Sequence, residues 1–162
     1  MAKKYLTLPI VLSLALGAQL WANVAPKSDE GDAAADHYNR GVDLLHKDNF
    51  KAAQKQFEKA LGIKEDSAEA HNNLGYALRR QGEEHYEEAL GHYDRALELD
   101  PKLAVAYMYR GVLHALSGDE EGARKDLAVL NELDRELGDQ LLKVIASGEE
   151  PDGHGGVAAR WE

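Results

Sequence analysis

The chain has 162 residues, of which 44% are hydrophobic, 30% are charged and 7% are aromatic, and it contains no cysteine. This composition is ordinary for one soluble domain, and the lack of cysteine excludes disulfides, thiolate zinc sites and cysteine nucleophiles. The net charge of −10 argues against nucleic acid as a partner, because an acidic surface repels a phosphate backbone.

The first residues have the pattern of an export signal. Lys3 and Lys4 precede an apolar stretch from Leu6 to Leu20 that is too short and too interrupted for a typical membrane span of roughly 20 apolar residues. We interpret residues 1–22 as a signal peptide cleaved after Ala22, which predicts an exported, periplasmic protein. The alternative is that residues 5–22 remain as an uncleaved anchor in the inner membrane.

Two segments lack periodicity and are predicted to have no fixed structure. Residues 23–33 include Pro26 and Gly31 and form a flexible leader, and residues 149–162 include three glycines and form a disordered tail. The structured part therefore lies between them.

One local sequence pattern occurs three times in the structured part of the chain. Glycine recurs at Gly41, Gly75 and Gly111, and alanine recurs at Ala53, Ala89 and Ala123. The implied unit has about 34 residues, with two extra residues in the second copy, and a period of this size is typical of stacked repeat arrays that bind other molecules. The three units span residues 34–67, 68–103 and 104–135.

Each unit is predicted to form two amphipathic helices. In the first unit these cover Ala33 to His46 and Phe50 to Leu61, with Asp48 and Asn49 offering a cap between them. The recurring glycine and alanine let the two helices cross closely. Larger residues four positions after each alanine are expected to fill the gap to the neighbouring unit: Phe57, Tyr93 and Leu127.

Three local features add to this repeat pattern: an insertion, a helix boundary and a terminal helix. The extra residues around Gly82 to His85 predict a bulged loop or an extra half-turn, and Asp100 is expected to cap a helix that begins at Pro101. Residues 136–148 predict a capping helix that Gly148 ends. Its charged side chains are expected to point outward: Glu136, Asp139 and Lys143.

The repeat resembles the tetratricopeptide repeat family. The second unit matches that family best, at Leu74, Gly75, Ala89, Tyr93, Ala96 and Pro101. The resemblance implies an all-α fold, a right-handed α-solenoid of three helical hairpins followed by a C-terminal capping helix. Arg40 and Arg110 depart from the family pattern, which often has leucine there.

In this family the first helices of the hairpins line a concave groove that binds peptides. Position by position, the resemblance implies a peptide-binding surface made of Tyr38, Val42, Asn72, Tyr76, Arg79, Arg80, Met108 and Val112. Such a surface suits an extended or helical peptide with apolar anchors and an acidic group near Arg79 or Arg80. Alternatively, Val105, Val112 and Leu116 pack under the capping helix or against a second subunit.

The sequence contains no catalytic constellation. It has no glycine-rich phosphate loop, no nucleophile elbow and no His-Glu-x-x-His pair, so we predict no catalytic residues, no metal site and no cofactor. His37 and His71 occupy equivalent positions and are interpreted as packing residues inside their hairpins. His85 and His92 lack the closely spaced ligands of a metal site.

The predicted function is that of a non-enzymatic scaffold which binds a protein or peptide, acting as an adaptor or assembly factor in the periplasm. No nucleic acid and no small-molecule substrate are expected. The alternatives are a structural scaffold that self-associates as a homodimer through the apolar third repeat, or a membrane-anchored version of the adaptor.

Overall fold

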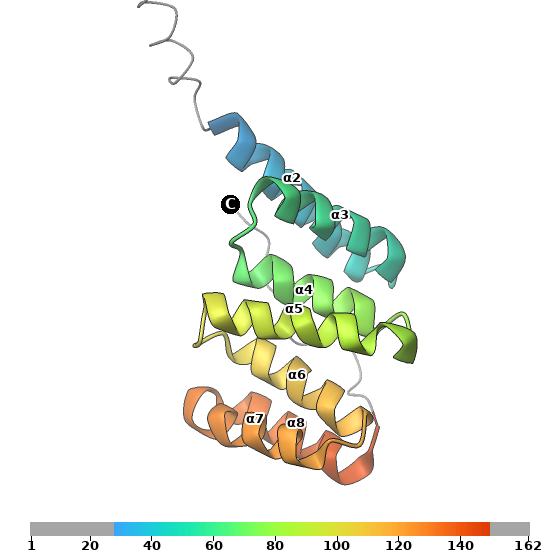
Figure 1. The fold of residues 1–162 in the computed structure, drawn as a ribbon, viewed down its shortest axis with the longest axis vertical. Coiled ribbons are helices and arrows are strands. Elements are labelled where there is room, and N and C mark those ends of the chain that lie inside the picture. The colour runs from blue at the N-terminus through green and yellow to red at the C-terminus, as the bar shows by residue number, and fades with distance from the viewer. Residues whose placement is uncertain (1–27, 150–162) are drawn as a thin grey trace, which may run out of the picture.

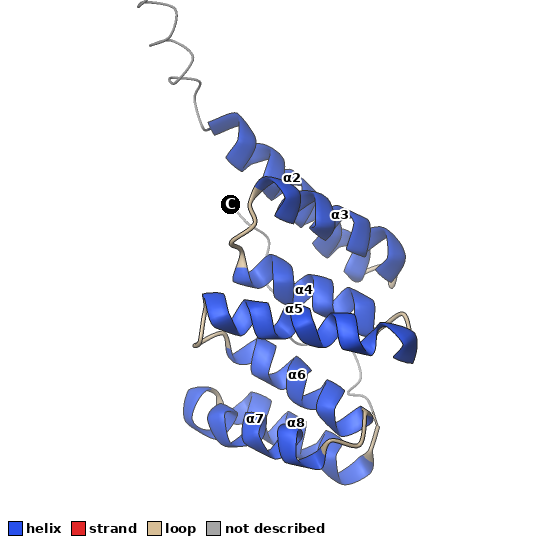
Figure 2. Ribbon diagram, in the orientation of Figure 1, coloured by secondary structure: helices blue, strands red, loops and turns tan. Residues whose placement is uncertain are grey.

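The computed structural model describes residues 28–149, which form an array of helical hairpins (Figures 1 and 2). The helices in chain order are α2 (Ser28–Leu45), α3 (Phe50–Ile63), α4 (Ala68–Arg79), the short 3-10 helix η1 (Glu83–His85), α5 (Tyr86–Leu99), α6 (Ala104–Leu116), α7 (Glu120–Leu133) and α8 (Arg135–Ser147). No strand occurs in this range. The all-α prediction is therefore confirmed for the described residues.

The hairpins stack in chain order along the long axis of the molecule (Figure 1). Helices α2 and α3 pair, as do α4 and α5 and then α6 and α7; each hairpin contacts the next through α3 with α4 and through α5 with α6. Helix α8 packs against both α6 and α7. Because each helix has only one apolar stripe, this stacking is what buries the stripes in one continuous core.

In the first two units, a close contact explains why glycine stands where the two helices of the hairpin cross. A Cβ atom added to Gly41 would lie 2.6 Å from the Phe57 ring, and one added to Gly75 would lie 2.9 Å from the Tyr93 ring. Phe57 and Tyr93 are fully buried. These two rings thus fill the space that the glycines leave within their own hairpins, whereas the sequence predicts that they fill the gap to the neighbouring unit.

The third hairpin is filled differently, and the expected role of Leu127 is wrong. Leu127 is only partly buried, whereas Asp126, one residue earlier, is almost fully buried. A Cβ atom on Gly111 would meet the Leu141 side chain at 2.5 Å and the Asp126 Cβ at 3.2 Å. The capping helix supplies Leu141 to this space, and Asp126 faces inward, where it forms an ion pair with Arg110.

The extra residues of the second unit form the half-turn that the sequence predicts. They fold as η1, directly before α5, and Gly82 precedes them with a φ of 137°, in the region that favours glycine. The insertion is thus absorbed between α4 and α5, which leaves the stacking of α4 on its neighbours undisturbed.

The boundary at Asp100 and Pro101 differs from the prediction. Asp100 ends α5, and Pro101 lies in a turn, while α6 begins at Ala104. The Asp100 carboxylate accepts a hydrogen bond from the Lys102 N–H at 2.9 Å, which is the local turn that aspartate favours before proline.

The start of the array also differs from the prediction, because residues 28–33 of the expected flexible leader are helical. Acidic residues near a helix start and alanines after it favour helix formation, and this segment has both. The capping helix is confirmed: Gly148 follows α8 in the left-handed conformation, and Glu136, Asp139 and Lys143 are exposed.

Several predictions concern residues outside the described range. These are the signal peptide or anchor within residues 1–22, the remainder of the leader, and the tail from residue 150 onward. Within residues 28–149, no helix is both long enough and apolar enough to cross a lipid bilayer.

Candidate functional site

The predicted peptide-binding residues all lie on the first helices of the three hairpins, where the resemblance places them. Tyr38 and Val42 are on α2, Met108 and Val112 are on α6, and the other four are on or directly after α4. Seven of the eight are buried, and Arg80 is half-buried. These residues therefore form a closely packed face, which we call the concave face after the groove that the resemblance implies.

An aromatic cluster lies at the centre of this face. The Tyr76 ring is 4.8 Å from the Tyr109 ring of α6 and 6.2 Å from the Phe50 ring at the start of α3, measured between centroids. Tyr76 thus connects all three hairpins. Tilted and edge-on ring pairs at these distances stabilise a fold beyond their buried area.

Two arginines surround this cluster. The Arg79 guanidinium lies 5.4 Å from the Tyr76 ring and 5.7 Å from the Tyr109 ring, and the Arg80 guanidinium lies 4.7 Å from the Phe50 ring. Arg80 also donates a hydrogen bond to the Tyr76 hydroxyl at 2.9 Å. Cations within about 6 Å of a ring are attracted to its face, so the rings hold both guanidinium groups in place.

A chain of amide side chains continues from α4 toward α2. The Asn72 Nδ2 donates to Asn73 Oδ1 at 3.1 Å, and the Asn73 Nδ2 donates to the Tyr38 hydroxyl at 3.1 Å. Burial, helped by the nearby Glu69 carboxylate, raises the pKa of Tyr38, so its hydroxyl stays protonated. The other end of this series of amides, Asn72 Oδ1, is buried and accepts no hydrogen bond from any group within residues 28–149.

Sequence reasoning missed three residues of this arrangement: Phe50, Asn73 and Tyr109. Asn73 and Tyr109 occupy the same place in their repeat units, two residues before the glycine that recurs in each unit. That place was not among the groove positions taken from the family. The signal that could have found them is the polar or aromatic character of this position in both units.

Two histidines meet at a separate place inside the second hairpin. The His71 ring of α4 stacks on the His92 ring of α5 with centroids 5.3 Å apart, and their Nδ1 atoms are 3.0 Å apart and share a hydrogen bond. His71 Nε2 also lies 3.1 Å from the Glu65 carbonyl oxygen. The interpretation of His71 as a packing residue inside its hairpin is confirmed, as it is for His37, whose Nδ1 lies 2.9 Å from Gln56 Oε1 of α3.

Burial lowers the pKa of both stacked histidines. The pKa of His92 falls to about 4, because of burial and the neighbouring His71, and that of His71 is also lowered, mainly by burial. Within residues 28–149, no three histidine or carboxylate groups lie close enough together to hold a metal ion.

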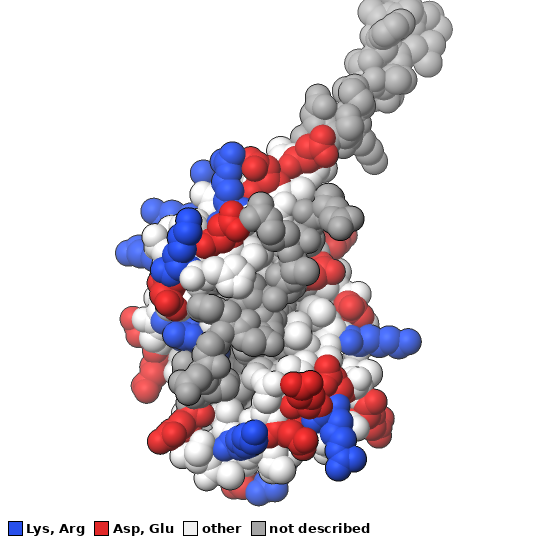
Figure 3. Space-filling view, turned by 180° about the vertical axis from the view of Figure 1, so that it is seen from behind, with Lys and Arg blue, Asp and Glu red and all other residues white. Residues whose placement is uncertain are grey.

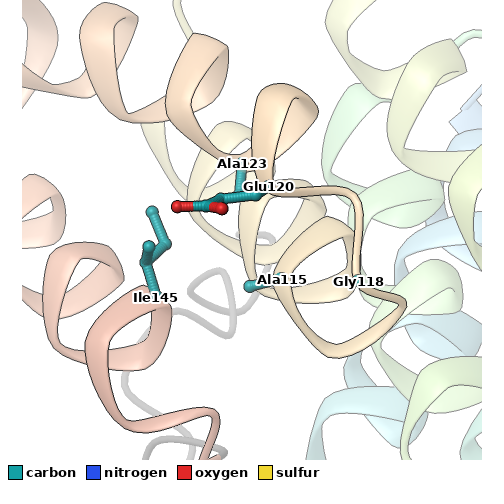
Figure 4. A pocket seen from close by; sticks show the side chains of 5 residues that line it. All are labelled: Ala115, Gly118, Glu120, Ala123 and Ile145. Atoms are coloured by element: carbon teal, nitrogen blue, oxygen red, sulfur yellow. The ribbon is translucent and has the colours of Figure 1, made fainter.

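A shallow pocket lies between α6, α7 and α8, away from the concave face. It has a volume of about 230 Å³, and Figure 4 shows Glu120 and Ile145 facing each other across it. Its other lining residues are Ala115, Gly118 and Ala123. These small groups offer one carboxylate and little else, so the pocket lacks the converging polar groups of a ligand site.

The charged side chains of the described residues are mixed in sign over the face opposite to that of Figure 1. Figure 3 shows acidic and basic groups interspersed there. Several form ion pairs along one helix, such as Arg124 with Glu120 and Lys125 with Glu121, both exposed. Exposed pairs of this kind contribute little to stability, and they offer no strong field to a charged partner.

Comparison with known proteins finds family models that match residues 38–103, the part of the chain that holds α3, α4, α5 and the C-terminal part of α2. Two sequence models, both described as tetratricopeptide repeat, match residues 68–103 and residues 38–84. Tetratricopeptide repeat protein 6 of Homo sapiens is similar to this chain, with 33% identity over 96 residues. The match covers 59% of this chain and only 18% of that protein, so the chain spans less than a fifth of that relative.

Proposed function

The chain is a tetratricopeptide-repeat protein, and from this premise we propose that its concave face binds an extended segment of another protein, so that it acts as an adaptor or assembly factor. Tetratricopeptide repeats generally mediate protein–protein interactions without catalysis. The proposal adds the face and the chemistry of the ligand.

The observation that carries the proposal is the position of Arg79 and Arg80 around the Tyr76 ring. The rings hold the guanidinium groups in fixed orientations, so binding a carboxylate costs little additional side-chain entropy. Guanidinium groups bind carboxylates with two parallel hydrogen bonds. The ligand class that fits is a peptide with an aromatic or large apolar residue for the ring cluster and a carboxylate close to it.

The proposal is tested by selecting peptides from a random display library on the immobilised chain. Peptides with an acidic residue next to an aromatic one should be enriched, and Arg79→Gln should weaken their binding by about tenfold to a hundredfold, the range for a hydrogen bond to a charged group. Arg124→Gln on exposed α7 is the matched control and should change nothing. Selected peptides that bind the Arg79→Gln protein equally well would refute this site.

A second candidate function is self-association as a structural scaffold. It is favoured by Leu133 at the end of α7 and Leu142 of α8, which are 40% and 49% exposed on adjacent helices. Light scattering over a range of concentrations tests it. A mass that stays at one chain at the highest concentration rules it out.

We further propose that the protein works in the periplasm, from the export pattern of residues 1–22. Cell fractionation and the mass of the purified N-terminal peptide test this. A mature chain that begins after Ala22 is the expected result, and an intact N-terminus in the membrane fraction would favour the anchored alternative.

A further inference from the structure

We propose that the exposed side of α3 is a second binding surface, which takes an acidic helical segment of a partner protein. The surface consists of Lys51, Lys55, Lys59 and Ile63, which we call the lysine row. It lies apart from the concave face, whose predicted residues are on or directly after the first helices of the hairpins. The inference therefore goes beyond the proposed function and does not depend on it.

The spacing of residues in α3 produces this row. Its members stand four positions apart, and residues at that interval are neighbours on one side of a helix. All four are exposed, whereas Ala53, Phe57 and Ala60 of the same helix are buried. The row ends at Ile63, which is 40% exposed and is one of the few large apolar side chains of the described residues that face solvent.

The three lysines of the row form no ion pair with any other residue that the structure describes. The one acidic residue of α3, Glu58, accepts a hydrogen bond from Gln54 Nε2 at 2.8 Å instead. Helix α7 shows the contrast, because Lys125 there pairs with Glu121 four positions before it. The ammonium groups of the row are therefore available to carboxylates from outside the array.

The arrangement of the row is unfavourable for α3 itself. Each lysine stands four positions from another lysine, and like charges at that interval destabilise a helix. A partner helix with carboxylates at the same spacing would relieve this repulsion, because it would place one negative charge beside each ammonium group. From Lys51 to Lys59 a helix rises about 12 Å, so two turns of such a partner are enough to cover the charged part.

The charge of α3 differs from that of its surroundings, and this difference selects the class of partner. Helix α3 has three lysines and one glutamate, whereas α2, which pairs with it at one end of the stack, has five acidic residues and one arginine (Figure 1). Screening acts over about 8 Å at physiological ionic strength, so a short segment on the row responds mainly to the lysines. A wide polyanion, such as duplex DNA or an anionic membrane, is also repelled by α2 and by the net charge of −10.

The ligand that fits is thus an amphipathic helical segment with acidic residues at every fourth position and an apolar residue at one end. Its carboxylates would lie beside the ammonium groups, and its apolar residue would pack on Ile63. Because most of the attraction is between exposed charges, the binding should be sensitive to salt.

The test selects peptides from a random display library on the full chain and measures the affinity of the synthesised winners. One group of peptides should have acidic residues four positions apart. The triple variant Lys51→Gln, Lys55→Gln, Lys59→Gln should weaken their binding by about tenfold, the combined effect of three exposed ion pairs. Arg79→Gln should leave their affinity unchanged, which separates this surface from the concave face.

The matched control replaces three exposed lysines of other segments by glutamine: Lys102, Lys125 and Lys143. It changes the net charge by the same amount, so it reports any effect of the overall field, and it should leave the affinity within about twofold of the wild type. Both triple variants should keep the circular dichroism of the wild type, because lysine and glutamine have similar helix propensities.

A second variant tests the apolar end of the row. Ile63→Gln should weaken the same peptides by up to about tenfold, because it removes the apolar contact. It should leave the salt dependence of binding as it is in the wild type, since no charge changes.

Three results overturn the proposal. The first is an equal loss of affinity in the two triple variants, and the second is an affinity that does not fall when sodium chloride is raised. The third is a different occupant of the row. Vesicles of equal parts phosphatidylglycerol and phosphatidylcholine, or a short DNA duplex, would then bind the wild type more tightly than the triple variant of the row, or light scattering would show dimers of the wild type alone.

Discussion

Arg110 of α6 and Asp126 of α7 form a doubly hydrogen-bonded ion pair, with Nε to Oδ2 at 3.1 Å and Nη2 to Oδ1 at 2.6 Å. Arg110 also contacts Asp94 of α5 at 2.7 Å, so one side chain joins the second hairpin to the third. Burial by itself lowers the pKa of Arg110, but the hydrogen bonds from Asp126 and Asp94 outweigh it and raise that pKa overall. The guanidinium therefore stays charged at any pH at which the protein folds.

Arg110→Ala should destabilise the protein by about 3 kcal/mol, because it leaves the carboxylate of Asp126 buried without its cation. The side chain of Asp126 is only 3% exposed, so water cannot replace the lost partner. Urea unfolding followed by circular dichroism measures the effect. Arg124→Ala, which removes an exposed arginine from α7, should cost less than about 0.5 kcal/mol.

Replacing both partners by apolar residues should recover most of that loss. The double variant Arg110→Met with Asp126→Leu removes the buried charge together with its partner, and such exchanges are often neutral. A double variant as unstable as Arg110→Ala would mean that the ion pair fixes the packing of α6 on α7 in a way that apolar residues cannot.

The stacked histidines predict a loss of stability in mild acid. The folded-state pKa of His92 is about 4, below the usual value of 6.5, so the unfolded chain binds more protons between these two values. The stability that the neutral pair contributes is complete above pH 6.5 and is lost as the pH falls toward 4. Between pH 7 and pH 4.5 we expect a decrease of about 1–2 kcal/mol in the free energy of unfolding.

The variant that tests this origin is His92→Gln, which fills a similar volume with a group that does not titrate. Its free energy of unfolding should vary less between pH 7 and pH 4.5 than that of the wild type. Equal pH dependence in the two proteins would assign the effect to carboxylates elsewhere in the chain.

Gly75→Ala sets two effects of opposite sign against each other. Alanine favours a helix over glycine by about 0.5–1 kcal/mol, but here its Cβ would lie 2.9 Å from the Tyr93 ring and 3.1 Å from the carbonyl oxygen of Ala89. The backbone atom cannot move without shifting α5, so we expect a net loss of about 1–2 kcal/mol. Thermal unfolding of both proteins measures it.

Gly91→Ala is the matched control within the same hairpin. Gly91 lies on the exposed side of α5, and an added Cβ meets nothing within 4 Å. This variant should be more stable than the wild type by about 0.5–1 kcal/mol. If both glycine variants changed stability equally, the close crossing of α4 and α5 would not limit the side chain at position 75.

A single residue, Asp134, connects the last hairpin to the capping helix. It ends α7 and begins α8, and its Oδ1 accepts hydrogen bonds from the N–H groups of Glu136 and Leu137 at 3.0 and 3.2 Å. Asp134→Ala should cost about 1 kcal/mol. Hydrogen exchange should accelerate in α8 before any other helix, whereas Asp134→Asn, which keeps an acceptor, should remain close to the wild type.

The helical fold was predictable because its causes are local and repeated. The period of the glycines and alanines fixes the register of the hairpins, and the two-residue excess before Ala89 locates η1. The pairing of Arg110 with Asp94 and Asp126 was not predictable. It depends on residues 16 positions away in both directions, and the repeat has no equivalent of it in the other units.

The sequence predicts which helices carry the candidate site residues, but it does not predict how closely their side chains pack. The family resemblance places the predicted residues on or directly after α2, α4 and α6, as the structure does, but it carries no information on their side-chain contacts. Tyr76 illustrates this, since its contact with Phe50 depends on the start of a second helix, which the groove positions do not include. Sequence spacing alone does not report such contacts between elements.

The position of α8 limits how far the array can grow. Leu137, Leu141 and Val144 of this helix cover the apolar side of the third hairpin, and Leu141 fills the space beside Gly111. A fourth hairpin would need the same surface for its own first helix. Engineers who wish to lengthen this protein should therefore insert new units before α6, where every junction is of the hairpin-to-hairpin kind, and leave the last three helices together as one terminal block.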